Sequence, residues 1–370
     1  MIVKKLYLKQ ISTELTLGSI KGQGNLKKYV FLILETDIGL GFSEIYCGTY
    51  RFVFLKKIVE YLSSVLKGKD INKDLILKNF LHQPFISGGG IVEIINSAFY
   101  NCFYMIEKKC IFYFNNNFNC KLYASGGTLS SSIEDIEKQI SYVNDNNLEA
   151  LKIRLDYRDL KNSIDRIDLL RSSKCNFAID LIYNTNYLDR LNFDLSNIIH
   201  NDKIDNLLWI EEPVFPSSAG IDWDKNISYI KEIGYDIALG ESMSSITELQ
   251  FLALYEYIDI IQLDVTHNSD YERLSAFMDI NEAKKMFGIH NWGSILGQIQ
   301  NLNMLNTSKN IKNIWWEIPL YSTKFDQELL EMLNLHTNVE LLEIKNLNLD
   351  KIINFLTNHE EKTHDDYKWT

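Results

Sequence analysis

The sequence predicts an α/β protein whose larger part is a barrel of alternating parallel strands and helices, preceded by a smaller α+β domain. Apolar runs in the second half of the chain indicate buried parallel strands. Six of these runs end in an ionisable residue: Asp180, Glu211, Glu241, Asp264, His290 and Glu317. These residues follow one another at intervals of 23 to 31 positions, which matches one strand plus its returning helix. Because active sites of such barrels gather at the carboxyl ends of the strands, a site is expected there.

Length and composition limit the class of protein. The chain has 370 residues, which suggests two domains, and 46% apolar with 24% charged residues is a globular composition. A net charge of −11 disfavours nucleic acid as a partner. The first residues lack a secretory apolar core, and no stretch reaches the roughly 18 apolar residues of a membrane span. Five cysteines without a CxxC pair indicate reduced thiols, so we expect a cytoplasmic protein with no membrane partner.

Residues 1–120 are predicted to form the α+β domain. The strand-like runs LYLKQIS, YVFLILET and LGFSEIY are separated by a glycine-bearing loop at 18–25 and a DIGLG turn, which predicts an antiparallel meander. Residues 52–109 show helical spacing, interrupted by the glycines at 88–90. The 18–25 loop is interpreted as a surface loop, with a mobile segment as the alternative.

Residues 121–335 are predicted to form the barrel. Helical spacing fills the gaps between strands, for example in YERLSAFMDINEAKKMF after the sixth strand, and Pro213 and Pro319 lie just beyond strands. Residues 336–370 are predicted to form a C-terminal segment outside the barrel. One interpretation is that this segment returns to the N-terminal domain, and its polar end is predicted to be solvated. The predicted strands are 121–125, 150–155, 177–182, 207–212, 236–240, 260–264, 288–292 and 314–318.

Three carboxylates, Asp180, Glu211 and Glu241, end the third, fourth and fifth predicted strands. Adjacent strands are about 5 Å apart, so these side chains can converge on one point. Like charges that close repel, and a hard divalent cation relieves the repulsion. All-oxygen ligands suit Mg²⁺, so a magnesium site is predicted. A helix cap or a surface ion pair is the alternative for each acid taken alone.

Asp264 and His290 end the sixth and seventh predicted strands. A carboxylate beside an imidazole fixes its tautomer and raises its basicity, which suits a general base for a weakly acidic C–H. Each residue alone is more often a structural hydrogen-bonding group. Their positions on neighbouring strands favour a catalytic dyad.

Lys152 and Arg154 lie two residues apart on the second predicted strand, so both point to the same face. Arg154 stays protonated and can stabilise an oxyanion. Lys152 can titrate, but beside Arg154 and a metal it is expected to serve the same electrostatic role. Glu317 follows two tryptophans, whose apolar surface tends to raise a carboxyl pKa. It is interpreted either as a neutral hydrogen-bond donor to a substrate carboxylate or as half of a buried salt bridge.

Together these motifs resemble the enolase superfamily, mandelate racemase subgroup. The resemblance implies a modified TIM barrel, (β/α)7β, with an N-terminal capping domain whose 18–25 loop closes the site. It also implies that Asp180, Glu211 and Glu241 bind Mg²⁺, that Asp264 and His290 are the base dyad, and that Glu317 contacts the substrate carboxylate. Relatives usually assemble, so a homo-oligomer is expected. The motifs are LKIR at 151–154, AID at 178–180, WIEEP at 209–213, GES at 240–242, IIQLD at 260–264, IHNWGS at 289–294, WWE at 315–317 and DIGLGFSE at 37–44.

One departure from the family pattern bears on the reaction. Arg154 stands where many relatives have a catalytic lysine, so a racemisation that needs a base on each face of the substrate is disfavoured. The sequence therefore predicts a one-base lyase, an acid-sugar dehydratase that forms a 2-keto-3-deoxy acid from a small carboxylate substrate. The alternatives are a racemase or epimerase with Lys152 as the second base, and a divergent barrel protein without catalytic activity.

Overall fold

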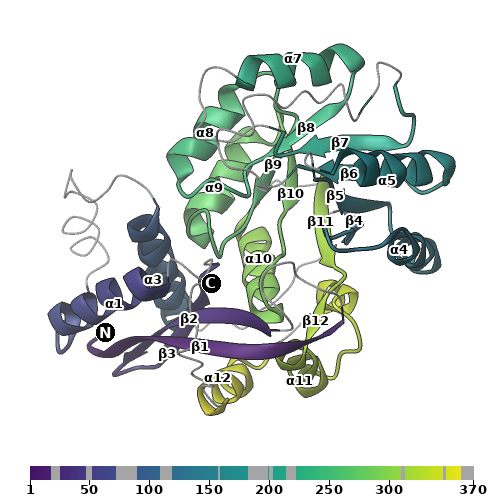
Figure 1. Ribbon diagram of the computed structural model, residues 1–370. Coiled ribbons are helices and arrows are strands. Elements are labelled where there is room, and N and C mark those ends of the chain that lie inside the picture. Colours follow the sequence, from purple (N-terminus) through teal and green to yellow (C-terminus); the bar gives the residue numbers. More distant parts are fainter. Residues whose placement is uncertain are drawn as a thin grey trace.

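The computed structural model contains an antiparallel sheet with its helices and a closed barrel of parallel strands wrapped by helices (Figure 1). The predicted fold class, a barrel with an N-terminal α+β domain, is confirmed. Within the described ranges, no helix combines the length and apolarity that a membrane crossing needs. The structure describes residues 1–17, 26–46, 52–71, 90–108, 119–156, 159–181, 199, 203–213, 222–309, 313–344 and 347–359.

Eight parallel strands close the barrel in the order β10-β11-β4-β5-β6-β7-β8-β9. Every predicted barrel strand is present. Each apolar run is buried on both of its faces, as in a parallel sheet that is covered on both sides. The strands are β4 (Asn119–Ser125), β5 (Ala150–Arg154), β6 (Phe177–Asp180), β7 (Leu207–Glu211), β8 (Asp236–Leu239), β9 (Ile260–Leu263), β10 (Met286–Ile289) and β11 (Asn313–Pro319).

Most strand boundaries differ from the sequence prediction by one or two residues, and two differences are larger. The seventh strand is predicted at 288–292, but β10 ends at Ile289. It ends there because the Asn291 amide donates to the side chain of Glu317 at 2.8 Å instead of continuing the ladder. The helical pattern after the sixth strand runs into β10, whereas the helix ends at Asn281, whose carbonyl accepts turn hydrogen bonds from the next residues.

Serine or aspartate side chains cap the first turns of five of the described barrel helices. In one of them, Ser132 and Asp135 form a reciprocal capping box. The other capping residues are Asp159, Ser245, Asp270 and Ser294. The helices are α4 (Ile133–Asp145), α5 (Leu160–Ser172), α7 (Asp222–Ile233), α8 (Ile246–Leu254), α9 (Tyr271–Asn281) and α10 (Ile295–Thr307).

Side chains alternate between the two faces of each barrel strand. The outward-facing ones, such as Leu151, Ile179 and Ile210, belong to the main core between strands and helices. The inward-facing apolar ones form a separate cluster that fills the barrel. Its fully buried members are Tyr123, Ala150, Ala178, Trp209, Ala238 and Ile260.

The predicted meander forms the N-terminal sheet, in the order β12-β1-β2-β3. The edge strand β12 comes from the chain beyond the barrel, which the sequence does not reveal because it is only two residues long. Strand β2 is buried on both faces: Phe31 packs in the main core, and Leu32 packs with the N-terminal helices. The elements are β1 (Val3–Leu17), β2 (Leu26–Thr36), β3 (Leu40–Glu44), α1 (Phe52–Leu66), α3 (Ile91–Lys108) and β12 (Ser322–Thr323). The predicted loop at 18–25 and most of the glycine break at 88–90 lie outside the described residues.

The C-terminal elements are α11 (Lys324–Leu333), the 3₁₀ helix η2 (Val339–Glu343) and α12 (Leu349–Asn358). Helix α12 lies beside the N-terminal sheet (Figure 1), where Lys9 Nζ donates to the carbonyl of Thr357 at 2.9 Å. The rings of Phe325 and Phe355 pack with centroids 5.4 Å apart. This part of the chain therefore contacts both α11 and the sheet.

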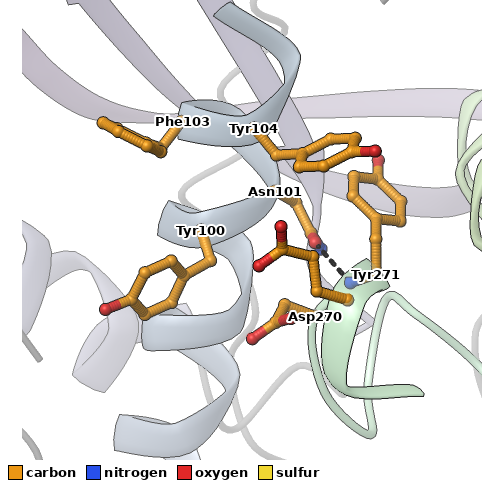
Figure 2. Close-up of a pocket in the computed structure, with 7 residues that line it drawn as sticks. Tyr100, Asn101, Phe103, Tyr104, Asp270 and Tyr271 are labelled. Atoms are coloured by element: carbon orange, nitrogen blue, oxygen red, sulfur yellow. Dashed lines mark hydrogen bonds between the residues drawn. The ribbon is translucent and has the colours of Figure 1, made fainter. Parts of the chain in front are cut away.

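Helix α3 of the N-terminal domain packs against the start of α9 in the barrel (Figure 2). Asn101 accepts a hydrogen bond from the backbone amide of Tyr271 at 3.1 Å, and the rings of Tyr104 and Tyr271 pack 5.8 Å apart. The cavity between these side chains has a volume of about 10 Å³, room for about one water molecule. It is a domain contact rather than a ligand site.

Candidate active site

The charged residues singled out in the sequence lie within two residues of the carboxyl ends of the barrel strands. Each is less than a tenth exposed to solvent. Burying a charged side chain costs free energy unless a partner compensates it, so a cluster of this kind indicates a functional site. Its members are Lys152, Arg154, Asp180, Glu211, Glu241, Asp264, His290 and Glu317.

Strand register brings the first members together. Arg154 on β5 pairs with Asp180 on β6, and Asp180 pairs in turn with Glu211 on β7. Residues in register on neighbouring parallel strands share a level of the barrel, so their inward side chains meet.

Glu241 enters the site through a glycine. Gly240, directly after β8, has a φ of +134°, and an added Cβ would lie 2.5 Å from the carbonyl oxygen of Gln262. Only glycine fits this conformation and this close approach. The chain can therefore leave β8 and place the next side chain at the mouth of the barrel.

Ion pairs connect the cations to the carboxylates. Lys152 Nζ lies 2.5 Å from Glu211 Oε1, 2.9 Å from Glu317 Oε1 and 3.9 Å from Asp180 Oδ2. Arg154 Nε lies 3.3 Å from the same Asp180 oxygen. In this structure the two cations thus occupy positions between the carboxylates.

His290 and Asp264 form a hydrogen-bonded pair. His290 Nδ1 lies 2.9 Å from Asp264 Oδ2, and the other Asp264 oxygen accepts from the Thr266 amide and hydroxyl at 2.9 and 2.7 Å. On the opposite side of the ring, His290 Nε2 lies 3.3 Å from Glu241 Oε2. The imidazole is therefore held at both nitrogens by carboxylates.

Glu317 lies in a buried salt bridge, with its Oε1 2.9 Å from Lys152 Nζ, as in the second of the two interpretations. Burial by itself raises its pKa, but the positive charge of Lys152, with His290 and a hydrogen bond from Ser125, holds the pKa well below its usual range. These contacts favour the salt-bridged carboxylate over the neutral hydrogen-bond donor. Sequence reasoning considered only the neighbouring tryptophans, whereas the deciding cation comes from β5.

The donor chemistry fits a hard divalent cation. Six buried carboxylates, the five named above and Glu212, gather at this end of the barrel against two cations, Lys152 and Arg154. Burial and repulsion from Glu211 raise the pKa of Glu241 well above its usual value, a sign of uncompensated negative charge. Among the described residues, however, no group of three or more acidic, histidine or cysteine side chains is already arranged to hold a metal ion.

Some residues at the site were missed in the sequence. Glu212, the second acid of WIEEP, accepts hydrogen bonds from Gly240 and Ser242, and burial beside Glu211 raises its pKa to about 8. The N-terminal domain contributes Tyr46, whose ring stands 5.8 Å from that of His290. The doubled glutamate was a visible signal for Glu212, but nothing in the sequence around Tyr46 indicated its contact with the barrel.

A second imidazole adjoins the same tyrosine. The ring of His267, which is 6% exposed, lies 5.9 Å from that of Tyr46, nearly perpendicular to it. The Tyr46 amide donates to the carbonyl of Thr266 at 2.9 Å, so the N-terminal domain is attached to the loop that follows Asp264. The N-terminal domain therefore lies directly beside the hydrogen-bonded pair of His290 and Asp264.

Comparison with protein families supports this picture. A family model described as enolase C-terminal domain-like matches residues 135–338, more than half of the chain. The resemblance inferred from the motifs is thereby confirmed. A comparison with curated proteins found no match.

Solved structures share the fold at low sequence identity. A racemase from Streptomyces coelicolor A3(2) with bound magnesium is 17% identical, with a TM-score of 0.66 over 85% of this chain and 89% of that one. The 3,6-anhydro-D-galactonate cycloisomerase from Zobellia galactanivorans is 16% identical, with a TM-score of 0.65 over 86% and 87%. An enolase from Bradyrhizobium complexed with magnesium and mandelic acid is 16% identical, with a TM-score of 0.64 over 85% and 87%.

Proposed function

Since this chain belongs to the enolase C-terminal domain-like family, we propose that it is a Mg²⁺-dependent acid-sugar dehydratase, a lyase acting on a small sugar carboxylate. The enzyme removes the proton α to the carboxylate and eliminates the β-hydroxyl, which gives a 2-keto-3-deoxy acid. The observation that carries the proposal is a site with one base, His290, and an arginine, Arg154, where a second base would be needed for racemisation.

His290 is the proposed base. The Asp264 carboxylate, 2.9 Å from Nδ1, favours the tautomer with its proton on that nitrogen, so Nε2 is the atom that accepts the substrate proton. The imidazolium formed in this way has Asp264 on one side and Glu241 on the other, and both negative charges stabilise it.

Arg154 and Lys152 act as cations. Burial alone lowers the pKa of both, but the surrounding carboxylates raise it: Asp180 first for Arg154, and Glu211 first for Lys152. Both side chains therefore keep their protons and stabilise the enediolate that forms when the α-proton leaves. The ion pairs of Lys152 with Glu211 and Glu317 favour this role over that of the opposite base in a racemase.

Asp180, Glu211 and Glu241 are the residues proposed to hold Mg²⁺, which when bound acts as a Lewis acid toward the substrate carboxylate. Their oxygen donors and the excess of buried negative charge support this assignment. Magnesium is bound in the racemase from Streptomyces coelicolor A3(2) and in the enolase from Bradyrhizobium.

The elimination balances with the groups at hand. The electron pair of the broken C–H bond becomes a carbon–carbon double bond as the bond from Cβ to its hydroxyl breaks. The proton held by His290 passes to the leaving oxygen, and water departs. The enol then tautomerises to the keto acid. Ionised Glu317 is proposed to orient Lys152 toward the substrate carboxylate rather than to contact that carboxylate itself.

A screen of acid sugars for Mg²⁺-dependent formation of 2-keto acid tests the proposal. Activity on at least one acid sugar that is lost in His290→Asn is expected, with folding retained. Incubation in D₂O separates dehydration from racemisation, because a one-base enzyme does not place deuterium into a stereo-inverted substrate. Recovery of inverted, deuterated substrate would favour the racemase alternative.

Two further parts of the proposal have their own tests. A non-catalytic barrel protein is the second alternative, and failure to bind Mg²⁺ at any concentration would favour it. Assembly into a homo-oligomer and a cytosolic location are proposed on the family resemblance and on the free thiols of the described cysteines, Cys102, Cys120 and Cys175. Sedimentation of the purified protein tests the assembly.

A further inference from the structure

Trp292, two residues after the proposed base, contacts a cation from each domain. Lys27 Nζ, on β2 of the N-terminal sheet, lies 5.1 Å from the centroid of the indole. The guanidinium carbon of Arg154, on barrel strand β5, lies 4.2 Å from the same centroid. Both distances fall within the range of cation–π attraction, and tryptophan is the strongest aromatic partner for it.

The environment of Lys27 is unusual for a lysine. The side chain is 6% exposed, and its Nζ donates to the Trp292 carbonyl at 2.9 Å and lies 4.4 Å from the centre of the Tyr321 ring. Among the described residues, no carboxylate forms an ion pair with it. Burial is the largest effect on its pKa; although the charges of Glu44 and Asp326 oppose it, the pKa falls from 10.5 to about 7. A buried cation held by a carbonyl and aromatic rings needs an explanation other than salt bridging.

The same carbonyl is bound a second time. Tyr321 Oη donates to the carbonyls of Trp292 and Gly293 at 2.5 and 2.8 Å, and its ring packs 4.6 Å from the indole. Lys27 and Tyr321 together therefore determine where the partly buried indole lies.

Arg154 depends on that indole. The edges of the guanidinium donate to the Gly126 carbonyl at 3.0 Å and to Ser125 Oγ at 3.4 Å, and Nε faces Asp180. These contacts hold the nitrogen atoms of the group. The indole of Trp292, over whose ring the guanidinium carbon lies, adds a contact that none of them supplies.

We propose that Lys27 is a positioning residue for the active site, acting through Trp292 to fix the guanidinium of Arg154. The N-terminal domain thereby contributes to catalysis with a residue that does not itself touch the reacting atoms. This inference rests on the proposed function, since Arg154 is the group that stabilises the enediolate. A purely structural role for Lys27, holding the two domains together, is the alternative.

The first test needs no substrate. The Nε–H resonance of Arg154 in ¹⁵N-labelled full-length protein is assigned by its loss in Arg154→Lys. Its chemical shift is expected to move in Lys27→Met, to stay close to wild type in Lys27→Arg, and to stay unchanged in Lys4→Met, which removes an exposed lysine of the same sheet. Trp292→Phe provides a second variant, in which the smaller ring should move the same resonance. An unchanged Arg154 signal in both Lys27→Met and Trp292→Phe would overturn the proposal.

The second test uses the acid sugar turned over fastest in the screen. Lys27→Met is expected to lower kcat by about 10- to 100-fold with little change in KM, because misplacing a transition-state contact acts on the chemical step. In a Trp292→Leu background the same substitution is expected to change kcat by less than about twofold, since the connection is already lost. Equal losses in both backgrounds would show that Lys27 acts by another route. If no acid sugar is turned over, the proposed function fails, and the resonance test still decides the link from Lys27 to Arg154.

Discussion

The inside of the barrel has an apolar layer and a charged layer, and the same strands supply both. In the lower layer, Ala150, Ala178 and Trp209 face one another; two residues further along the same strands, Lys152, Asp180 and Glu211 do so. All six side chains are at most 2% exposed. Equal burial therefore has different effects: the lower layer removes apolar surface from water, and the upper layer holds opposite charges that compensate one another.

The lower layer packs large rings into space left by alanines. The ring of Trp209 lies 5.2 Å from Tyr123 and 5.0 Å from Trp315. Such interdigitated apolar packing stabilises the fold directly. The upper layer gains little net stability, because desolvation offsets the attraction within buried ion pairs. Residues that stabilise the fold and residues of the candidate site are thus only two positions apart on the same strand.

The sharpest way to break this comparison is to substitute an upper-layer residue without disturbing the lower layer. His290→Asn keeps a polar side chain beside Asp264 but removes the base, so the rate of keto-acid formation should fall by about 10²- to 10⁴-fold. Thermal unfolding should change little. His336→Asn, at an exposed histidine, serves as the matched control. Survival of most activity in His290→Asn would remove His290 from the role of base.

The converse substitution is in the lower layer. Trp209→Ala leaves a cavity among buried rings, and the free energy of unfolding should fall by about 3–5 kcal/mol, measured by urea denaturation. It also removes the indole that donates to Glu211 at 3.3 Å, so activity is expected to fall as well, but less than in His290→Asn. A stable Trp209→Ala protein would contradict the role assigned to the lower layer.

The third prediction concerns Glu44, a buried carboxyl group where the N-terminal domain contacts the barrel. Glu44 accepts hydrogen bonds from Ser294, but burial outweighs them and raises its pKa from 4.5 to about 7. The unfolded chain releases this proton at lower pH than the folded one, so stability falls as pH rises from about 4.5 to 7 and then stays level. Glu44→Gln lacks this loss, so its stability relative to wild type should rise by roughly 3 kcal/mol between pH 5 and pH 8. Urea titrations at both pH values measure the difference, and parallel curves would contradict it.

The smallest expected effect is stabilisation by Mg²⁺, which should depend on the charged layer and not on the apolar layer. Mg²⁺ at about 100 times its dissociation constant should stabilise the folded protein by about 2.7 kcal/mol, seen as a rise in the melting temperature. Asp180→Asn should abolish this rise. Ala178→Gly, two residues earlier on β6, should lower the melting temperature without Mg²⁺ but leave the Mg²⁺-induced rise unchanged. A full Mg²⁺ response in Asp180→Asn would exclude that carboxylate as a ligand.

Much of this arrangement could be predicted because strands impose a period of two. Lys152 and Arg154 share a face for that reason, and the residues that end apolar runs meet at one end of a parallel barrel. The state of Glu317 could not be predicted in the same way. Its neighbours in sequence are tryptophans, but its partner is Lys152 on a strand more than 160 positions earlier.

The sequence by itself determined the strand order of the barrel and the level at which charges replace apolar side chains, and its motifs resembled those of the family. Local patterning suffices for the first two, because each depends only on the period of a strand and on the spacing between strands. Tertiary structure alone decided which charges pair, and it placed Lys27 and Tyr46 of the N-terminal domain against the barrel. Electrostatic partners and domain contacts depend on distances through space, and no periodicity along the chain encodes them.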